Sequence, residues 1–467
     1  MRFTIKTVGC KVNTYESNKI RDDLIKLGFD YIDVNNKDEY KNLDYYIVNT
    51  CSVTAIADKK SRQMLHLAKK YNPNVKVIAI GCLIDSLDAS PLLGVDYILS
   101  NKQKSTLPDL IKDLAQVHSA SLRENLEAST TPERLRSELV ERMRRPSEAT
   151  KYSWGAKCPW GTSPRAFIKI QDGCDEYCTY CLIPYLRGHI KSRDDDDIVS
   201  EITNKVKNGV KEVVLTGIHL SSFGLDRENI SYEREGAISI AQASLTKIIE
   251  KIANIKVDIE GETKEIFRIR LGSLEPRIID EGFIKFLTDE ESLVSKKFCP
   301  NFCLSLQSGS DKILTSMNRH YTTADFKNAC DLIRKYMKDA TITTDVIVGF
   351  PGETDEDFEE NLEFVKNMRF YNPNIFPYSI RKGTKAATFP NQLTNKVKHD
   401  RCVKMIYECE KISKEIESLY TGDVSYASPY KIGDIVGNIL IEEIIEEGGK
   451  KYAVGYTKNY IKRKIQI

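Results

Sequence analysis

The chain of 467 residues contains no apolar run long enough to cross a membrane, because a helical span needs about 20 such residues in succession. Its first residues, 1–6, carry neither the apolar segment nor the cleavage site of a secretory signal. We therefore expect a cytoplasmic protein without a membrane partner. Net charge is also nearly absent, since 69 Lys and Arg residues offset 67 Asp and Glu residues. Any contact with nucleic acid must then depend on local basic patches.

Cysteine, in contrast, is plentiful, with 12 residues. Spread over so long a chain, and without an export signal, these cysteines do not indicate a disulfide scaffold. Roles in metal binding, cluster binding or catalysis fit better. The six histidines are scattered and indicate no separate metal site. The length predicts two or three domains.

Residues 1–118 alternate strand and helix patterns, which predicts a parallel α/β domain. Strands are expected at residues 3–7, 45–49, 76–80 and 97–99. Residues 119–159 lack apolar periodicity and are rich in Ser, Ala, Glu and Arg. We predict a linker or insertion there that is largely disordered, with a basic tRNA-binding arm as the alternative.

Residues 160–396 predict a second α/β domain. Six β runs alternate with helical patterns, at residues 167–170, 212–215, 267–271, 302–306, 343–348 and 374–377. Six βα units are too few for a closed eight-stranded barrel, so we expect an open, partial (βα)6 barrel whose second connection, 226–264, is unusually long. Residues 397–430 predict a helical connector, and 431–467 a small β module of three strands, at residues 435–445, 452–456 and 460–467.

The most specific signal is the loop after the first barrel strand, which contains Cys174, Cys178 and Cys181. Three thiolates at spacings of four and three can hold one 4Fe–4S cluster and leave one iron open. The amino and carboxylate groups of S-adenosylmethionine can chelate that iron. A zinc ribbon is the alternative, but it needs a second close cysteine pair.

The remaining cysteines of the barrel and its flanks do not supply such a pair. We assign them to packing, with Cys303 as a core strand residue between Phe302 and Leu304. This group is Cys158, Cys299, Cys303, Cys330, Cys402 and Cys409.

A second three-cysteine site is predicted in the N-terminal domain. Cys10, Cys51 and Cys82 each follow an expected strand. The carboxyl ends of parallel strands face one crevice, where α/β sheets bind ligands. Independent burial of three small side chains is the alternative.

Tyr180 precedes the last cysteine of the 174–181 loop, and the whole pattern resembles the radical S-adenosylmethionine superfamily. With the N-terminal three-cysteine domain and the C-terminal β module, the chain resembles the methylthiotransferases that modify tRNA. The resemblance extends to almost the whole chain except 119–159 and the connection after Asp226. Further matching segments are residues 9–16, 49–54, 81–82, 187–188, 192–193, 215–217, 271–276, 304–309 and 348–354.

Within that family, residues 11–13 and 57–63 resemble the branch that acts on N6-threonylcarbamoyladenosine at anticodon-loop position 37. The resemblance therefore implies an enzyme that adds a methylthio group to C2 of this nucleoside. Its threonyl carboxylate would favour Arg or Lys in the pocket. The alternatives are the same chemistry on N6-isopentenyladenosine-37 or on a ribosomal-protein aspartate, a radical enzyme for a small molecule, and a cluster-containing RNA-binding protein without turnover.

The implied cofactors are two 4Fe–4S clusters and S-adenosyl-L-methionine. The cysteines of the 174–181 loop would hold the cluster that cleaves S-adenosylmethionine, and the radical formed would take hydrogen from C2 of the adenine. The N-terminal cysteines would hold an auxiliary cluster that carries the sulfur. The residues expected to bind S-adenosylmethionine are Thr216, Gly217, Ser273, Glu275, Gly349, Gly352 and Glu353. For some of them the alternative is a structural role only, in a tight turn or as an acidic loop residue.

The implied partners are the tRNA anticodon loop, an electron donor and a sulfur source, neither of them identified, and we expect a monomer. An open barrel would admit an extruded base. The C-terminal module resembles the tRNA-binding module called TRAM, although it ends at Ile467, short of five strands. Asn374 stands where the family commonly has histidine. Aromatic and basic residues of the module suit stacking on bases and contact with phosphates. The alternative is an ordinary amphipathic sheet. These residues are Tyr452, Tyr456, Lys458, Tyr460, Lys462 and Arg463.

Overall fold

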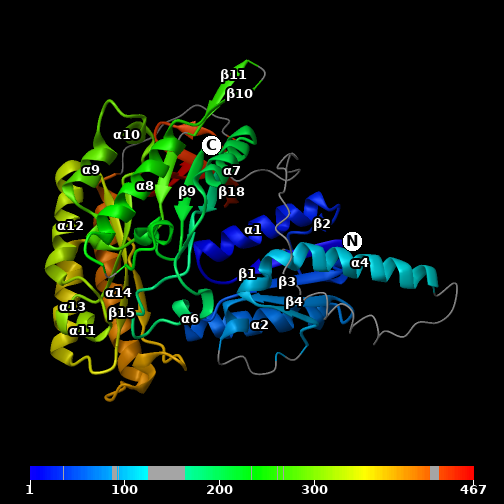
Figure 1. The fold of residues 1–467 in the computed structure, drawn as a ribbon, viewed down its shortest axis with the longest axis horizontal. Helices are drawn as coiled ribbons and strands as arrows, with labels where there is room; N and C mark the ends of the chain where they lie inside the picture. The colour runs from blue at the N-terminus through cyan, green and yellow to red at the C-terminus, as the bar shows by residue number, and fades with distance from the viewer. Residues whose placement is uncertain are drawn as a thin grey trace. The chain divides into compact units, whose positions relative to one another are not determined.

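The computed structural model describes residues 1–34, 36–86, 92, 94–124, 164–232, 234–259, 261–266, 268–420 and 431–467. The chain divides into two compact units, Met1–Lys157 and Cys158–Ile467 (Figure 1). From residue 125 onward the predicted linker lies outside the described residues, as do residues 421–430 of the predicted connector. In the described part of the chain, no helix is long and apolar enough to cross a membrane.

The first unit is a parallel sheet with the strand order β2-β1-β3-β4-β5. Because successive strand residues face opposite sides, Ile47 and Ile80 share an apolar cluster with helices α1 and α4. Tyr46 and Val48 pack with α2 on the other face. The elements are β1 (Arg2–Thr7), α1 (Lys11–Lys26), β2 (Asp30–Tyr31), η1 (Glu39–Asn42), β3 (Tyr45–Thr50), α2 (Ala55–Tyr71), β4 (Lys76–Gly81), α3 (Cys82–Asp85), β5 (Tyr97–Leu99), η2 (Asn101–Thr106) and α4 (Leu107–Glu124).

The second unit contains two parallel sheets, ordered β12-β9-β6 and β13-β14-β15-β16. Strand β13 follows β12 directly after Gly272, so the two together occupy one strand position. The two sheets therefore join into a single arc with six strand positions. Among the described residues, β6 and β16 pair with no other strand beyond β9 and β15. The prediction of an open, partial barrel is therefore confirmed. Its strands are β6 (Arg165–Lys169), β9 (Glu212–Thr216), β12 (Arg268–Leu271), β13 (Ser273–Leu274), β14 (Asn301–Gln307), β15 (Thr341–Val348) and β16 (Asn374–Pro377).

Helices line the outer side of this arc, as Figure 1 shows for α9, α12 and α13. The long second connection contains α8 and the hairpin β10–β11, which accounts for its length. The connecting elements are β7 (Gln171–Asp172), α6 (Ile183–Arg187), β8 (Lys191–Ser192), α7 (Asp195–Lys207), η3 (Leu220–Ser222), η4 (Leu225–Glu228), α8 (Ala237–Ala253), β10 (Lys256–Ile259), β11 (Glu262–Glu265), η5 (Pro276–Ile278), α9 (Glu281–Thr288), α10 (Leu293–Lys297), α11 (Asp311–Ser316), α12 (Thr323–Tyr336), α13 (Asp355–Met368), η6 (Lys385–Thr388) and α14 (Asn395–Ser418).

The alternation along β14 separates an apolar outer face from a polar inner face. Phe302 and Leu304 are buried in the core shared with the helices, whereas Cys303 is half-buried and points to the other side. Its Sγ lies 3.2 Å from Oγ of Ser273. The assignment of Cys303 to the core was wrong, because its two apolar neighbours take the outward positions of the strand.

The C-terminal module is an antiparallel sheet of four strands, one more than predicted. The expected run 435–445 is interrupted at Gly437, whose φ of +59° allows a turn inside it. The strands are β17 (Ile435–Val436), β18 (Ile439–Glu447), β19 (Lys450–Thr457) and β20 (Lys462–Gln466).

A buried charge cluster joins this module to the amino ends of the barrel strands. Glu212 faces Arg165 and Arg268 in the strand register, and its carboxylate accepts hydrogen bonds from Nε of Arg165 (2.6 Å) and of Arg270 (3.0 Å). Nη1 of Arg268 donates to the backbone oxygen of Tyr456 in β19 (2.9 Å). The module is thus anchored by ion pairs that are removed from water.

Two aromatic residues predicted to face RNA belong to this internal cluster. The rings of Tyr456 and Tyr460 stack with centroids 4.6 Å apart, and the guanidinium of Arg165 lies 4.9 Å from the centroid of the Tyr460 ring. The guanidinium of Arg270 lies 4.5 Å from the same ring. For these two residues the prediction of a stacking platform was wrong, because arginines of the same chain occupy the ring faces.

Glu212→Gln should lower the free energy of unfolding by about 3–5 kcal/mol, because it leaves buried guanidiniums without their carboxylate. Burial alone would raise the pKa of Glu212, but Arg270 and Arg165 lower it to about 2. The carboxylate therefore contributes its full stability above its unfolded pKa of about 4.5 and loses it as the pH falls from about 4.5 towards 2. Urea unfolding of the wild type and of Glu212→Gln from pH 7 to pH 3 should show a larger loss of stability in the wild type, because the other carboxyl groups with lowered pKa, such as Asp195 and Asp357, titrate in both proteins.

Glu363→Gln is the matched control, since Glu363 is an exposed residue that pairs with Lys366. It should leave unfolding close to that of the wild type at pH 7. An equal loss of stability in both variants would contradict the anchoring role of Glu212.

Candidate functional site

The three cysteines of the 174–181 loop follow β7 directly. The loop depends on Gly173, whose φ is +68° and where a Cβ atom would lie 1.9 Å from the carbonyl oxygen of His189. The N–H of Cys174 donates to the oxygen of Gly188 (3.1 Å). The N–H of Ile183, at the start of α6, donates to Sγ of Cys181 (3.4 Å). These hydrogen bonds and the close approach at Gly173 therefore fix the path of the loop that carries the three cysteines.

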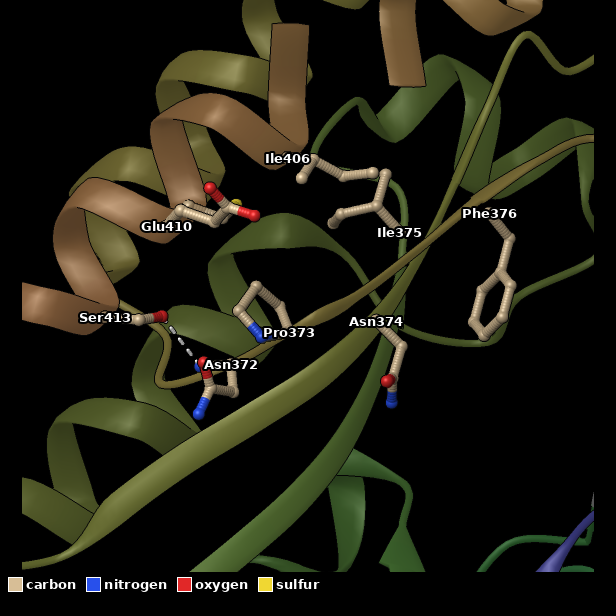
Figure 2. Close-up of a pocket in the computed structure, with 9 residues that line it drawn as sticks. Asn372, Pro373, Asn374, Ile375, Phe376, Ile406, Glu410 and Ser413 are labelled. Atoms are coloured by element: carbon tan, nitrogen blue, oxygen red, sulfur yellow. Dashed lines mark hydrogen bonds between the residues drawn. The ribbon is translucent and has the colours of Figure 1, made fainter. Parts of the chain in front are cut away.

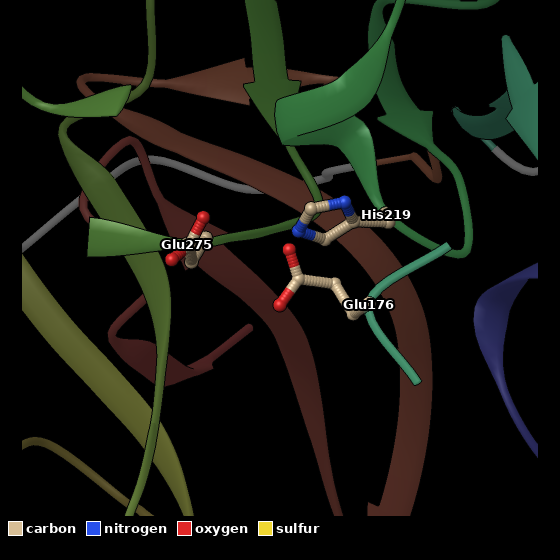
Figure 3. A group of neighbouring side chains, drawn as sticks. All are labelled: Glu176, His219 and Glu275. Carbon is tan, nitrogen blue, oxygen red and sulfur yellow. The ribbon is translucent and has the colours of Figure 1, made fainter. Parts of the chain in front are cut away.

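Three neighbouring side chains, Glu176, His219 and Glu275, form a cluster at this loop that we call the acidic pocket (Figure 3). Glu176 comes from the cysteine loop, His219 follows β9, and Glu275 follows β13. One ligand atom from each of the three lies within 4.8 Å of the other two. Nε of Arg277 donates to the Glu275 carboxylate (2.6 Å), as does the hydroxyl of Tyr232. The ends of two barrel strands thus converge on the cysteine loop.

His219 was missed by the sequence analysis, although it closely follows Thr216 and Gly217 at the end of a strand. Both of its ring nitrogens are buried and have no hydrogen-bond partner among the described residues. Burial, Arg319 and Arg277 lower the pKa of His219 to about 3, so the imidazole is neutral at neutral pH. Buried nitrogens without partners are costly, which marks this pocket as a ligand site.

The charges around these three side chains do not favour a divalent metal ion. Glu176 already lies 3.6 Å from guanidinium nitrogens of Arg277 and Arg319. The two carboxylates therefore have two cationic partners, and His219 adds no charge. A ligand with polar groups, such as S-adenosylmethionine, fits this donor set.

The strand ends supply the predicted residues around this pocket. Thr216 is the buried last residue of β9. At Gly217 a Cβ atom would lie 2.8 Å from Oε1 of Gln171, so the close approach of the two segments requires glycine. Ser273 begins β13, where its Oγ contacts the Cys303 thiol. The structure therefore brings Thr216, Gly217, Ser273 and Glu275 to the carboxyl ends of neighbouring strands.

The predicted residues after β15 form a tight turn. Gly349 and Gly352 have φ values of +73° and +82°. The carboxylate of Glu353 accepts a hydrogen bond from the N–H of Gly349 (2.8 Å) and another from Arg401. Glu353 therefore braces the turn through Oε1, while its buried Oε2 has no hydrogen-bond partner among the described residues and remains for a ligand together with backbone groups and the open side of Gly352. A cofactor contact here stays a prediction.

In the first unit, Cys10, Cys51 and Cys82 follow β1, β3 and β4. The register pairs Thr50 with Gly81, so Cys51 and Cys82 are neighbours. At Gly9 a Cβ atom would lie 3.0 Å from Sγ of Cys51, so the backbone beside Cys10 runs against that thiol. The three predicted ligands thus lie at one edge of the sheet.

Hydrogen bonds hold the backbone around these N-terminal cysteines. The N–H of Cys51 donates to Oγ of Ser61 (3.0 Å), which donates back to the Cys51 oxygen (3.0 Å). Nδ2 of Asn101 donates to Sγ of Cys82 (3.6 Å). Contacts of this kind orient metal ligands, which supports a built site rather than three independently buried thiols.

A separate pocket of about 390 Å³ lies between β16 and α14 (Figure 2). Asn374, Ile375 and Phe376 line it on one side, and Ile406 and Glu410 on the other. None of the residues predicted to bind a cofactor lines this pocket. Asn374, the departure from the family pattern, donates to Oδ1 of Asp345 (2.9 Å).

Comparison with known proteins agrees with this geometry. Residues 168–365 match the Radical SAM superfamily, and residues 2–92 match a family described as Uncharacterized protein family UPF0004. A radical S-adenosylmethionine methyltransferase, TsrM from Kitasatospora setae, solved with cobalamin and a [4Fe-4S] cluster, shares the fold with a TM-score of 0.52. It is 14% identical, over 82% of this chain and 76% of that one.

Several relatives are similar over most of their length. Threonylcarbamoyladenosine tRNA methylthiotransferase MtaB of Bacillus subtilis is 30% identical over 98% of this chain and 88% of the relative. The protein of the same name from Aquifex aeolicus is 32% identical over 89% of both. The tRNA-2-methylthio-N(6)-dimethylallyladenosine synthase of Endomicrobium trichonymphae is 30% identical over 100% of this chain and 96% of the relative. Identity of this level over nearly complete chains shows that the protein belongs to the radical S-adenosylmethionine methylthiotransferase family.

Proposed function

We propose that this tRNA methylthiotransferase acts on N6-threonylcarbamoyladenosine at position 37 of the anticodon loop and adds a methylthio group to C2 of the adenine. The observation that carries the proposal is the presence of two separate three-cysteine sites, one in the loop after β7 and the other at the carboxyl ends of the parallel strands β1, β3 and β4. Relatives named for the threonylcarbamoyl substrate, at 30–34% identity, support it. Relatives named for the dimethylallyl substrate, at 30–32% identity, make that nucleoside the alternative.

The cofactors are S-adenosylmethionine and two 4Fe–4S clusters. When bound, they supply the radical chemistry that an adenine C2–H bond requires, because this bond carries no proton that a side-chain base could remove. Cys174, Cys178 and Cys181 would hold one cluster. The cysteines that follow β1, β3 and β4 would hold the other, with three thiolates and one iron left open.

The chain's own residues bind and orient the cofactor. The carboxylates of Glu275 and Glu176 can accept hydrogen bonds from the amino or hydroxyl groups of S-adenosylmethionine, and the neutral His219 can donate one hydrogen bond and accept another. Arg277 fixes Glu275 through its Nε. Thr216 and the six other predicted contact residues surround this position or form the turn after β15.

A cation for the threonyl carboxylate is available next to the auxiliary cysteines. Lys11 follows Cys10 and is exposed. Arg62, from the second segment typical of the threonylcarbamoyl branch, is already committed, since its Nε donates to Oδ1 of Asp58 (2.6 Å). Lys11 is therefore our candidate for the carboxylate.

Replacing the three N-terminal cysteines by alanine should halve the iron content after anaerobic reconstitution. We expect about eight irons per chain in the wild type and about four in the variant, because each 4Fe–4S site holds four. Iron and acid-labile sulfide analysis measures this directly. Cys330→Ala, at a buried cysteine of α12, is the control and should keep about eight. About four irons in every protein would disprove the auxiliary site.

Incubation with tRNA carrying either nucleoside distinguishes the substrates. Mass spectrometry of the digested tRNA should show methylthiolation of threonylcarbamoyladenosine and none of isopentenyladenosine. Lys11→Gln should raise KM for the threonylcarbamoyl tRNA about tenfold, which corresponds to one charged hydrogen bond of about 1.4 kcal/mol.

Lys19→Gln, on the same helix about two turns further from Cys10, should leave that KM unchanged. Preferential modification of isopentenyladenosine would overturn the proposed substrate. An equal effect of the two lysine variants would remove Lys11 from its role.

A further inference from the structure

Arg319 is a buried cation in direct contact with the cysteine loop. Its side chain is 6% exposed, and its Nη1 donates to Sγ of Cys178 at 2.9 Å. The same nitrogen lies 3.6 Å from the carboxylate of Glu176.

The guanidinium of Arg319 is held from behind by Tyr321. Nε of Arg319 donates to the Tyr321 hydroxyl (3.1 Å), and the guanidinium carbon lies 4.8 Å from the centroid of that ring. The hydroxyl in turn donates to the backbone oxygen of Leu306 in β14 (2.9 Å) and to that of Ser305. The orientation of the guanidinium is therefore fixed by the barrel itself.

The segment that ends in Arg319 is also bonded to the residues that flank Cys178. The N–H of Thr179 donates to the oxygen of Met317 (3.0 Å), and its hydroxyl donates to the oxygen of Ser316 (2.9 Å). Nδ2 of Asn318 donates to the oxygen of Glu176 (3.1 Å). Asn318 adopts a φ of +59°, a conformation that asparagine tolerates better than most residues.

These contacts have an electrostatic consequence. An arginine stays protonated at every accessible pH, and a charged N–H bonded to a thiolate stabilises negative charge on the sulfur. Reduction of an iron–sulfur cluster adds negative charge that its cysteine sulfurs share, and hydrogen bonds to those sulfurs shift its potential. A guanidinium fixed beside one cysteine ligand therefore favours the reduced form of the cluster.

We propose that Arg319 is a positioning residue for the cluster of Cys174, Cys178 and Cys181: its N–H bond to the Cys178 sulfur holds this ligand and raises the reduction potential of the cluster. The proposal rests on the proposed function only in that these three cysteines hold a cluster. It concerns the step in which an electron enters, and it is independent of which tRNA is modified.

The test uses the full chain with the three N-terminal cysteines replaced by alanine, so that a single cluster is observed. Arg319→Met removes the donor, and Arg319→Lys keeps the charge without the planar fork. Arg334→Met is the matched control, because Arg334 donates to the backbone oxygen of Met368 on the outer helices. Iron content, the electron paramagnetic resonance signal of the reduced cluster and the midpoint potential are measured without tRNA.

In Arg319→Met the equilibrium should shift about tenfold against the reduced cluster, which is a fall of about 59 mV in midpoint potential for one electron. Arg319→Lys should lie between this variant and the parent chain, and Arg334→Met should match the parent. An unchanged potential and unchanged resonance signal in Arg319→Met, with the cluster bound, would overturn the proposal.

Loss of the cluster from Arg319→Met while Arg334→Met retains it would support the positioning role, and Tyr321→Phe would then test the potential. This variant keeps the guanidinium but releases its Nε, so a smaller fall in potential is expected, and an unchanged potential would overturn the tuning role. If these shifts are observed and the wild-type chain, reconstituted with both clusters, modifies neither tRNA, the proposed function alone is disproved. A parent chain without iron would disprove both.

Discussion

Parallel strand pairing is the constraint on which both sites depend. Parallel strands point in one direction, so their carboxyl ends meet at one edge, and the side chains that follow them are brought together from distant parts of the chain. In the first unit the pairing of Thr50 with Gly81 sets Cys51 beside Cys82. In the second, the ends of β9 and β13 carry His219 and Glu275 to the same pocket. A shift of register by one residue would separate the ligands of either site.

Much of the fold could be predicted because strand periodicity and strand order are local properties of the sequence. The strand of residues 97–99 and that of residues 374–377 have the predicted bounds, and the other barrel strands differ from prediction by one or two residues at either end. The six-stranded open arc followed from counting βα units. The split of the run 435–445 was missed, because a single glycine with positive φ inside an apolar run is a weak signal.

Side-chain partners, in contrast, could not be read from periodicity. The sequence shows Tyr456 and Tyr460 among basic residues, which suits RNA, but it does not show that Arg165 lies against their rings nearly 300 positions earlier in the chain. Arg319 stands 141 positions after Cys178, in a segment without metal-ligand character. His219 is a single histidine after a strand end, with no sequence motif that marks it as a site residue. Each depends on contacts that form only once the barrel has folded.

The two ends of the barrel use the same residue type for different purposes, and the difference lies in which groups the guanidiniums meet. At the amino ends, Arg165 and Arg270 bond to the Glu212 carboxylate and Arg268 to backbone oxygens of the C-terminal module, so these guanidiniums are bonded to groups of the same chain.

At the carboxyl ends, Arg319 donates to a sulfur, and the nitrogens of His219 have no partner among the described residues. Charged side chains that are bonded within the chain hold two parts of the fold together. Buried polar atoms without partners lower the stability of the fold, and they are expected only where a ligand binds.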